Sequence, residues 1–265
     1  MSSQYKDLVV VACHAIFVGN PEASDCDIYS PLQWNLQSFQ QPCGSKPGEH
    51  ETFLRHIQAG LDILSFGAIK ESSILVFSGG YTASHIKLSE ARSYYNAAVA
   101  CTRASARAES CAKLLGSRIL LEEHATDSFQ NLLFSILLFR KTIGTYPETI
   151  TVITHAFKTE RFLLSHAKAI RWPQGCIRVQ GLNPVMSADE YQETLNGERR
   201  AFDSWKEDLY GTHPPLSSKR VQRGWQEETI NEVGDGLEMG VKDLLRYAGG
   251  GRGQALFDGA LPWCQ

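Results

Sequence analysis

Polar residues of kinds that can bind or react follow four apolar segments that we expect to form β-strands. These residues are Cys13 and His14, then Ser78, Gly79 and Gly80, then Glu122, Glu123 and His124 with Asp127 and Ser128, and finally Thr154 and His155 with Lys158 and Arg161. In open α/β sheets, ligands bind just outside the carboxyl ends of the strands. The strand ends therefore predict one shared polar site.

The acidic and amide residues of this set are the candidates for catalysis. Glu122 and Glu123 would point to opposite faces of a strand, so one of them could enter the crevice. Burial would raise the pKa of that carboxyl and suit it to general acid or base catalysis; a solvated acidic pair is the alternative. Asp127 and Gln130 are spaced like a helix capping pair. Asn131, one turn after Asp127, could face the same side.

The glycines and cations of the set are the candidates for holding a ligand. Gly79 and Gly80 would let the backbone approach a ligand closely and offer N–H groups to an anion, although a plain tight turn would look the same. Lys158 and Arg161 lie at an expected helix start, where cations oppose the helix dipole. An anionic ligand would explain them, and so would a facing carboxylate such as Glu122 or Glu160.

Composition narrows the class of partner. The chain has 265 residues and a net charge of -3, so no overall basic field would attract nucleic acid. No apolar run approaches the ~20 residues that span a bilayer. The seven cysteines are scattered, which argues against a disulfide framework or zinc finger. We expect a cytoplasmic protein with a small-molecule ligand and neither a nucleic-acid nor a membrane partner.

Strand and helix patterns alternate along the chain. Strands are predicted at 8–12, 73–77, 118–121, 149–154 and 177–180, and helices at 51–66, 89–100, 104–115, 127–142 and 158–169. This alternation predicts a Rossmann-like open parallel sheet with helices on both faces.

Three regions follow from these patterns. Residues 1–182 would form the α/β domain, with 19–49 as a long loop that could act as a lid or binding loop. Residues 183–248 would form a C-terminal extension packed on the same domain, with a helix at 198–209 and a loop at 211–224. The Gly-rich start of residues 249–265 predicts a flexible tail.

The order of the polar stretches resembles the domain-of-unknown-function family that contains the bacterial envelope proteins SanA, YdcF and ElyC. The matching stretches, between about Leu8 and Gly181, are Ser78-Gly79-Gly80, Ser89-Glu90-Ala91, Glu122 with residues 127–131, and residues 154–161. The resemblance implies a Rossmann-like fold and a cluster of charged residues suspected to be catalytic. One bacterial member is thought to bind S-adenosylmethionine, so the resemblance also implies that cofactor.

The chain departs from the bacterial pattern at two places. Residues 127–131 replace the bacterial Asn-Thr-x-Glu-Asn, and Lys158 stands where the bacterial pattern has a histidine. We therefore expect different proton chemistry at position 158. Residues 157–162 look like the eukaryotic, fungal-like branch, which lacks the membrane anchor of some bacterial members.

Two functions remain open on this basis. The first is an enzyme, a hydrolase or group transferase, acting on a small anionic or nucleotide-like molecule. The second is a non-catalytic protein that binds S-adenosylmethionine or a nucleotide. The expected catalytic residues are Glu122, Asp127 and Asn131; the expected ligand-binding residues are His14, Ser78, Gly79, Gly80, Glu90, Ser128, Lys158 and Arg161. His14, His124 and His155 lack the spacing of a metal site, and we expect none.

Overall fold

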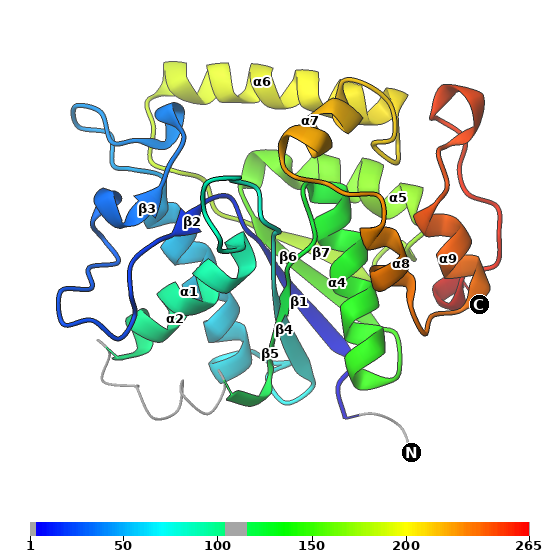
Figure 1. The fold of residues 1–265 in the computed structure, drawn as a ribbon, viewed down its shortest axis with the longest axis horizontal. Helices are drawn as coiled ribbons and strands as arrows, with labels where there is room; N and C mark the ends of the chain where they lie inside the picture. The colour runs from blue at the N-terminus through cyan, green and yellow to red at the C-terminus, as the bar shows by residue number, and fades with distance from the viewer. Residues whose placement is uncertain (1–3, 104–115, 265) are drawn as a thin grey trace.

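A computed structural model describes residues 4–103 and 116–264 of the chain (Figure 1). Its centre is a five-stranded parallel sheet of order β5-β4-β1-β6-β7. The strands are β1 (Asp7–Ala12), β4 (Ser73–Ser78), β5 (Ile119–Glu122), β6 (Thr149–Thr154) and β7 (Ile177–Gly181). The chain is therefore a Rossmann-like α/β protein, as the alternation of patterns predicted.

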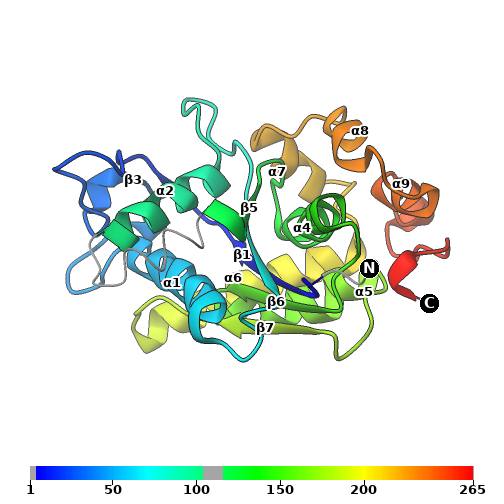
Figure 2. The same cartoon turned by 90° about the horizontal axis from the view of Figure 1, so that it is seen from below.

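Helices cover both faces of the sheet because the central strands are apolar on both sides. On β1, Val9 and Val11 pack with α1 (His50–Phe66) and α2 (Glu90–Arg103). Leu8 and Val10 point to the opposite face and pack with α4 (Ser128–Ile143). Figures 1 and 2 show α1 and α2 on one side of the sheet and α4 on the other. The helix predicted at 104–115 lies outside the described residues.

The segment after β6 is not the α-helix predicted at 158–169. It consists of a 3₁₀ turn η3 (Ala156–Lys158), a π-helical turn η4 (Arg161–His166) and one short turn α5 (Ala167–Ala169). π-Helical turns occur frequently at functional sites. This one begins at Arg161, close to the carboxyl end of β6.

The long loop after β1 is held by small elements. Residues Ile16–Phe17 (β2) and Trp34–Asn35 (β3) form an antiparallel pair, and two 3₁₀ turns, η1 (Pro31–Gln33) and η2 (Ser38–Gln40), flank β3. Trp34 is buried against Phe17 and Phe53. The loop is thereby fixed beside the carboxyl end of β1.

The extension contains α6 (Ala188–Glu207), α7 (Leu216–Gln222), α8 (Thr229–Gly234) and α9 (Met239–Leu245). Figure 1 shows α6 lying across the carboxyl-end side of the sheet, with α7 beside it. The helix predicted at 198–209 starts ten residues earlier, at Ala188, where Ser187 caps it. The loop predicted at 211–224 contains α7.

Residues 249–264 differ from the predicted flexible tail. Phe257, Leu261 and Trp263 belong to the same hydrophobic cluster as α4 and α9. The Trp263 indole N–H also donates to the carbonyl of Ile170, at 2.8 Å. The Gly-rich start at 249–253 suggested mobility, but the apolar residues after it anchor the segment.

Within residues 4–103 and 116–264, no helix has both the length and the apolar character that crossing a membrane requires.

Candidate functional site

A cavity of about 790 Å³ lies at the carboxyl ends of the strands, where the strand-end residues predicted a site. Its floor includes residues after β1, β5 and β6. Residues 37–40 of the long loop form one wall, and α6 and α7 form another. This volume is in the range of small-molecule sites. Residues distant in the chain therefore share one polar cavity.

Lys158 lies in this cavity with its ammonium group 3.4 Å from Nδ1 of His14. The other ring nitrogen of His14 is 3.1 Å from the hydroxyl of Thr154. When Lys158 donates to Nδ1, the ring proton lies on Nε2 and is donated to Thr154. Burial and the nearby charge of Arg161 lower the pKa of Lys158 to about 7. Lys158 can therefore exchange a proton near neutral pH.

The imidazoles next to Lys158 are held neutral. His14 stacks on His155 with ring centres 4.5 Å apart, and His56 meets His155 edge-on at 5.1 Å. Burial, followed by the charge of Lys158, lowers the pKa of His14 and His155 well below the usual value. Burial also lowers the pKa of His56 to about 4. Neutral rings do not neutralise an incoming anion, so that task falls to the cations.

His155 is the least satisfied polar side chain at the site. It is 3% exposed, lines the cavity, and neither ring nitrogen has a hydrogen-bond partner among the described residues. A buried polar group without a partner costs free energy unless something else satisfies it. Its place in the cavity wall means that a ligand can meet that need.

Three carboxyl groups, Glu49, Glu90 and Glu198, line the cavity with raised pKa values. The hydroxyl of Thr82 donates to Glu90, and burial is the main cause of the raised pKa. Burial also raises the pKa of Glu49, which lies just before α1. Glu90 belonged to the predicted ligand-binding set, whereas the polar loop sequence around Glu49 gave no reason to select it.

Gly79 has a packing role beside Glu90. A Cβ at position 79 would lie 2.7 Å from a carboxylate oxygen of Glu90. The prediction of free backbone donors is wrong, because the N–H of Gly79 donates to the backbone carbonyl of Glu122 and the N–H of Gly80 donates to that of Ala125. These donors hold two strand ends together and are not available to an anion.

Glu122 does not line the cavity, in contrast to the expected catalytic position. The hydroxyl of Ser78 donates to one carboxylate oxygen at 2.5 Å, and the N–H groups of His124 and Ala125 donate to the other. Burial nevertheless raises the pKa of Glu122 to about 7. The carboxyl group is enclosed by protein donors and joins the ends of β4 and β5. Glu123, next to it, accepts from Ser89.

Asp127 and Asn131 line the cavity, and both are also committed to structure. Asp127 caps α4 by accepting from the N–H of Gln130, and its second oxygen accepts from Nε of Arg220 at 2.5 Å. The amide of Asn131 donates to the carbonyl and the hydroxyl of Ser78, both at 2.9 Å. These bonds fix the edge of the cavity rather than leave the groups free to react.

Arg161 and Ser128 also line the cavity. Nε of Arg161 donates to Glu198 of α6 at 2.8 Å, and a second nitrogen pairs with the other oxygen. Of the alternatives open in the sequence, a facing carboxylate therefore accounts for Arg161, although the partner is neither Glu122 nor Glu160. The hydroxyl of Ser128 is 2.8 Å from Nε2 of His166.

The extension supplies cations that the strand ends did not predict. Arg223 lines the cavity and donates to the carbonyl of Thr126 at 2.9 Å. Lys219 and Arg200 line it as well. Lys219 and Arg223 belong to a basic cluster in the sequence, and this cluster is the signal from which they could have been predicted.

Across the described ranges, no group of three or more His, Cys, Asp or Glu residues is placed to hold a metal ion. His124 faces Glu232 instead, with 3.6 Å between a ring nitrogen and a carboxylate oxygen.

Comparison with known proteins gives one distant relationship. The chain is 26% identical over 257 aligned residues to a Saccharomyces cerevisiae protein described as uncharacterized protein YOR238W, with 82% of this chain and 83% of the relative covered. No family model matches the chain, and no solved structure matches it. This chain is thus a distant homologue of an uncharacterized yeast protein over most of the length of both.

Proposed function

We propose that the chain is an enzyme, a hydrolase or group transferase, that acts on a small anionic or nucleotide-like molecule in the cavity at the strand ends. The observation that carries this proposal is the position of Lys158, which lies in the cavity beside His14 and has a pKa of about 7 there. Strongly perturbed pKa values gather at functional sites. A lysine that titrates near neutral pH can act as a base or an acid.

The roles of the cavity residues follow from their charges and contacts. Arg223, Lys219 and the protonated fraction of Lys158 would bind the negative group of the substrate. The amine of Lys158 would take a proton from the attacking group, and His14 would orient that amine. Glu90, whose pKa is raised by burial, would supply a proton to the leaving group. Glu122 has a positioning role in this proposal.

The family resemblance supports the same site. Several residues of the stretches that carry the resemblance line the cavity, among them Glu90, Asp127, Ser128, Asn131 and Lys158, whereas Ser78, Gly79 and Gly80 do not. On this basis we propose a relationship to the SanA, YdcF and ElyC family, in its soluble fungal-like branch. A pKa of about 7 for Lys158 lies close to the ordinary pKa of histidine. The lysine could therefore take part in a proton transfer at this position, as an amine where the bacterial pattern has an imidazole.

Non-catalytic binding is the second candidate, and one observation favours it. Glu122, Asp127 and Arg161 are each enclosed or paired, so much of the predicted catalytic charge stabilises the cavity wall. S-adenosylmethionine fits the groups that remain. Glu49 and Glu90 could accept from the ribose hydroxyls, and Lys158 could bind the carboxylate of the methionine part. Saturable binding without product would support this candidate.

The test measures binding and turnover in the same samples. The wild-type protein is screened by thermal shift against nucleoside phosphates, sugar phosphates and S-adenosylmethionine, and each mixture is then analysed by mass spectrometry. Lys158→Met should abolish turnover, whereas Lys168→Met, at an exposed lysine of α5, should leave it unchanged. If Lys158→Met forms product as fast as the wild type, the catalytic proposal is wrong.

A further inference from the structure

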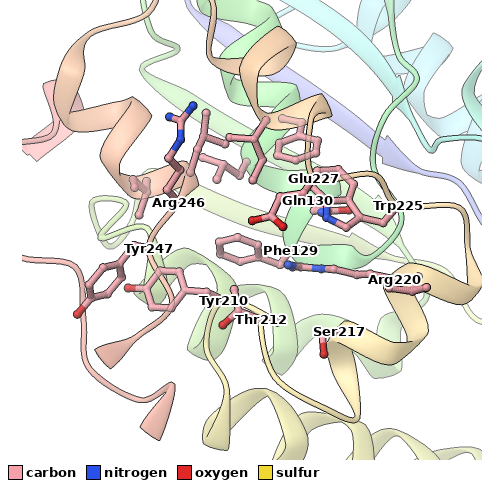
Figure 3. A pocket seen from close by; sticks show the side chains of 17 residues that line it. Phe129, Gln130, Tyr210, Thr212, Ser217, Arg220, Trp225, Glu227, Arg246 and Tyr247 are labelled. Atoms are coloured by element: carbon pink, nitrogen blue, oxygen red, sulfur yellow. The ribbon is translucent and has the colours of Figure 1, made fainter. Parts of the chain in front are cut away.

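A second cavity, of about 400 Å³, lies on the other side of α7 (Figure 3). It is enclosed by α4 and the segments that lead through α7, α8 and α9. Phe129 and Phe134 of α4 form one wall, and the ring of Trp225 stacks on Phe134 with ring centres 5.9 Å apart. Leu244 and Tyr247 close the opposite side. The cavity is therefore apolar over much of its wall.

The wall that separates the two cavities is α7. Leu216, Lys219 and Arg223 line the first cavity, whereas Ser217 and Arg220 line the second. The two cavities share no lining residue among those described. A ligand in the second cavity would therefore not be a part of the substrate bound in the first.

Arg220 gives the second cavity a specific polar group. Its Nε donates to Asp127, while its Nη2 is buried with no hydrogen-bond partner in the described part of the chain. The residue is 7% exposed. A Cβ at Gly211 would lie 2.6 Å from this nitrogen, so the glycine, at φ +67°, is what allows the guanidinium to pack this close to the backbone. Figure 3 shows the guanidinium next to the ring of Phe129.

A buried charged donor that lacks an acceptor is costly, and a ligand oxygen could remove that cost. The apolar walls would at the same time favour a ligand with an aromatic or aliphatic body. Glu227 and Arg246 also line the cavity, and their opposite charges offset each other, so Arg220 is left to set the charge of the ligand. These features together select for a monoanion with an apolar body.

We propose that this cavity is a second binding site, for a small aromatic monocarboxylic acid. The carboxylate accepts a hydrogen bond from Nη2 of Arg220, and the ring lies between Phe134, Trp225 and Leu244. Ser217 lines the same cavity from α7. The proposal does not depend on the function of the first cavity.

The test uses 3-phenylpropionate as the probe and its uncharged amide as the comparison, with binding followed by isothermal titration calorimetry. The neighbouring serines of α7 provide matched variants. Ser217→Phe would fill the cavity, whereas Ser218 is exposed and does not line it, so Ser218→Phe is the control. Circular dichroism and thermal unfolding establish that both variants are folded.

We expect saturable binding of the acid to the wild type and to Ser218→Phe, and at least about tenfold weaker binding to Ser217→Phe. The amide should also bind at least about tenfold more weakly, since it lacks the charge that Arg220 recognises. Lys158→Met should bind the acid as the wild type does, because Lys158 lines the other cavity. Absence of binding, equal binding of acid and amide, equal binding by the two serine variants, or loss of binding in Lys158→Met would each overturn the proposal.

Discussion

Lys158 is a side chain whose surroundings disfavour its charged form. Its amine is drawn into a cavity between His14 and the charges of Arg161 and Arg223. Burial and those cations disfavour the protonated form, and the carboxylates of Glu198 and Glu49 only partly compensate. A lysine in this position destabilises the folded protein at neutral pH, which is a cost that packing alone does not explain.

We therefore expect Lys158→Met to raise the free energy of unfolding at pH 7, by on the order of 2 kcal/mol. The pKa of Lys158 is lowered, from 10.5 in the unfolded chain to about 7 in the folded protein. Between these values the unfolded chain binds more protons, so the stability of the wild type rises with pH. The advantage of the methionine variant should be greatest at pH 7 and below, and should shrink towards pH 10.

Denaturant unfolding at several pH values measures this difference. Lys168→Met, on exposed α5, is the control and should show no such pH dependence. A Lys158→Met variant that is no more stable than the wild type at pH 7 would show that Lys158 keeps its ordinary pKa.

Glu122 leads to a different expectation, because its carboxyl group is an acceptor for three donors. Glu122→Ala would leave the hydroxyl of Ser78 and the N–H groups of His124 and Ala125 without their partner. We expect a loss of about 2–4 kcal/mol in the free energy of unfolding. Glu122→Gln should lose much less, since its oxygen can accept from the two N–H groups and its amide can donate to Ser78.

Chemical denaturation of the two variants separates the structural role from a catalytic one. The wild-type protein and Glu122→Gln should also bind ligands of the first cavity equally, because the side chain does not line it. If the alanine variant were as stable as the glutamine variant, these hydrogen bonds would not be holding the ends of β4 and β5 together.

At the level of elements, α6 is held to the molecule by few contacts. Trp205 is the buried residue of this 20-residue helix. The pair between Arg161 and Glu198 ties the middle of α6 to η4, and the side chains of both residues are largely buried. An amphipathic helix is usually fixed by an apolar stripe. In α6, the largely buried pair of Arg161 with Glu198 carries much of that task above the cavity, whereas the pair of Lys46 with Glu190 near its start is more exposed.

Glu198→Ala should therefore loosen α6, because it leaves the charge of Arg161 without a partner in a partly buried place. We expect hydrogen exchange of amides in residues 188–207 to become at least about tenfold faster, as for a local opening made easier by about 1.4 kcal/mol. Hydrogen exchange followed by mass spectrometry measures this directly. Glu193→Ala is the control, because Glu193 lines the same cavity from α6 but is exposed. Equal exchange in the two variants would mean that the ion pair does not hold the helix.

The elements also show why some parts of the fold could be predicted. The runs at β1, β4 and β6 are short and apolar or β-branched, and the observed strands lie within one residue of the predicted bounds. The first half of α6 carries Gly197 and few apolar residues, so periodicity did not show its start. Helix α7 follows Pro214 and Pro215, which favoured a loop.

The position of the cavity could be predicted from the sequence, but the surroundings of its individual side chains could not. Strand ends of a parallel sheet meet at one edge, which brings His14 and Lys158 into the same cavity. Whether a carboxyl group at that edge faces the cavity or the protein depends on tertiary contacts. These contacts enclose Glu122 and leave Glu90 at the cavity. The pairing of Arg161 with Glu198 likewise depends on where α6 folds back.

For the whole molecule, the chain after residue 248 completes the core. Trp263 is buried between Trp172 and Tyr146, with ring centres 5.5 and 5.0 Å away, and donates to the carbonyl of Ile170. Arg171 also donates to the carbonyls of Phe257 and Gly259. The last residues therefore join the segment after η4 to the outer side of α4. A mobile tail would make none of these contacts.

Trp263→Ala should accordingly lower the free energy of unfolding by about 3 kcal/mol, because it removes a buried aromatic ring and the hydrogen bond of its indole. Leu256→Ala is the matched control, since Leu256 lies in the same segment but is 41% exposed, and we expect a change within about 0.5 kcal/mol. Urea denaturation of both variants gives the comparison. If both unfold at the same urea concentration as the wild type, residues 249–264 are not part of the cooperative core. A large effect of Trp263→Ala alone would indicate that the last residues unfold together with the rest of the molecule, because the ring packs on both Trp172 and Tyr146.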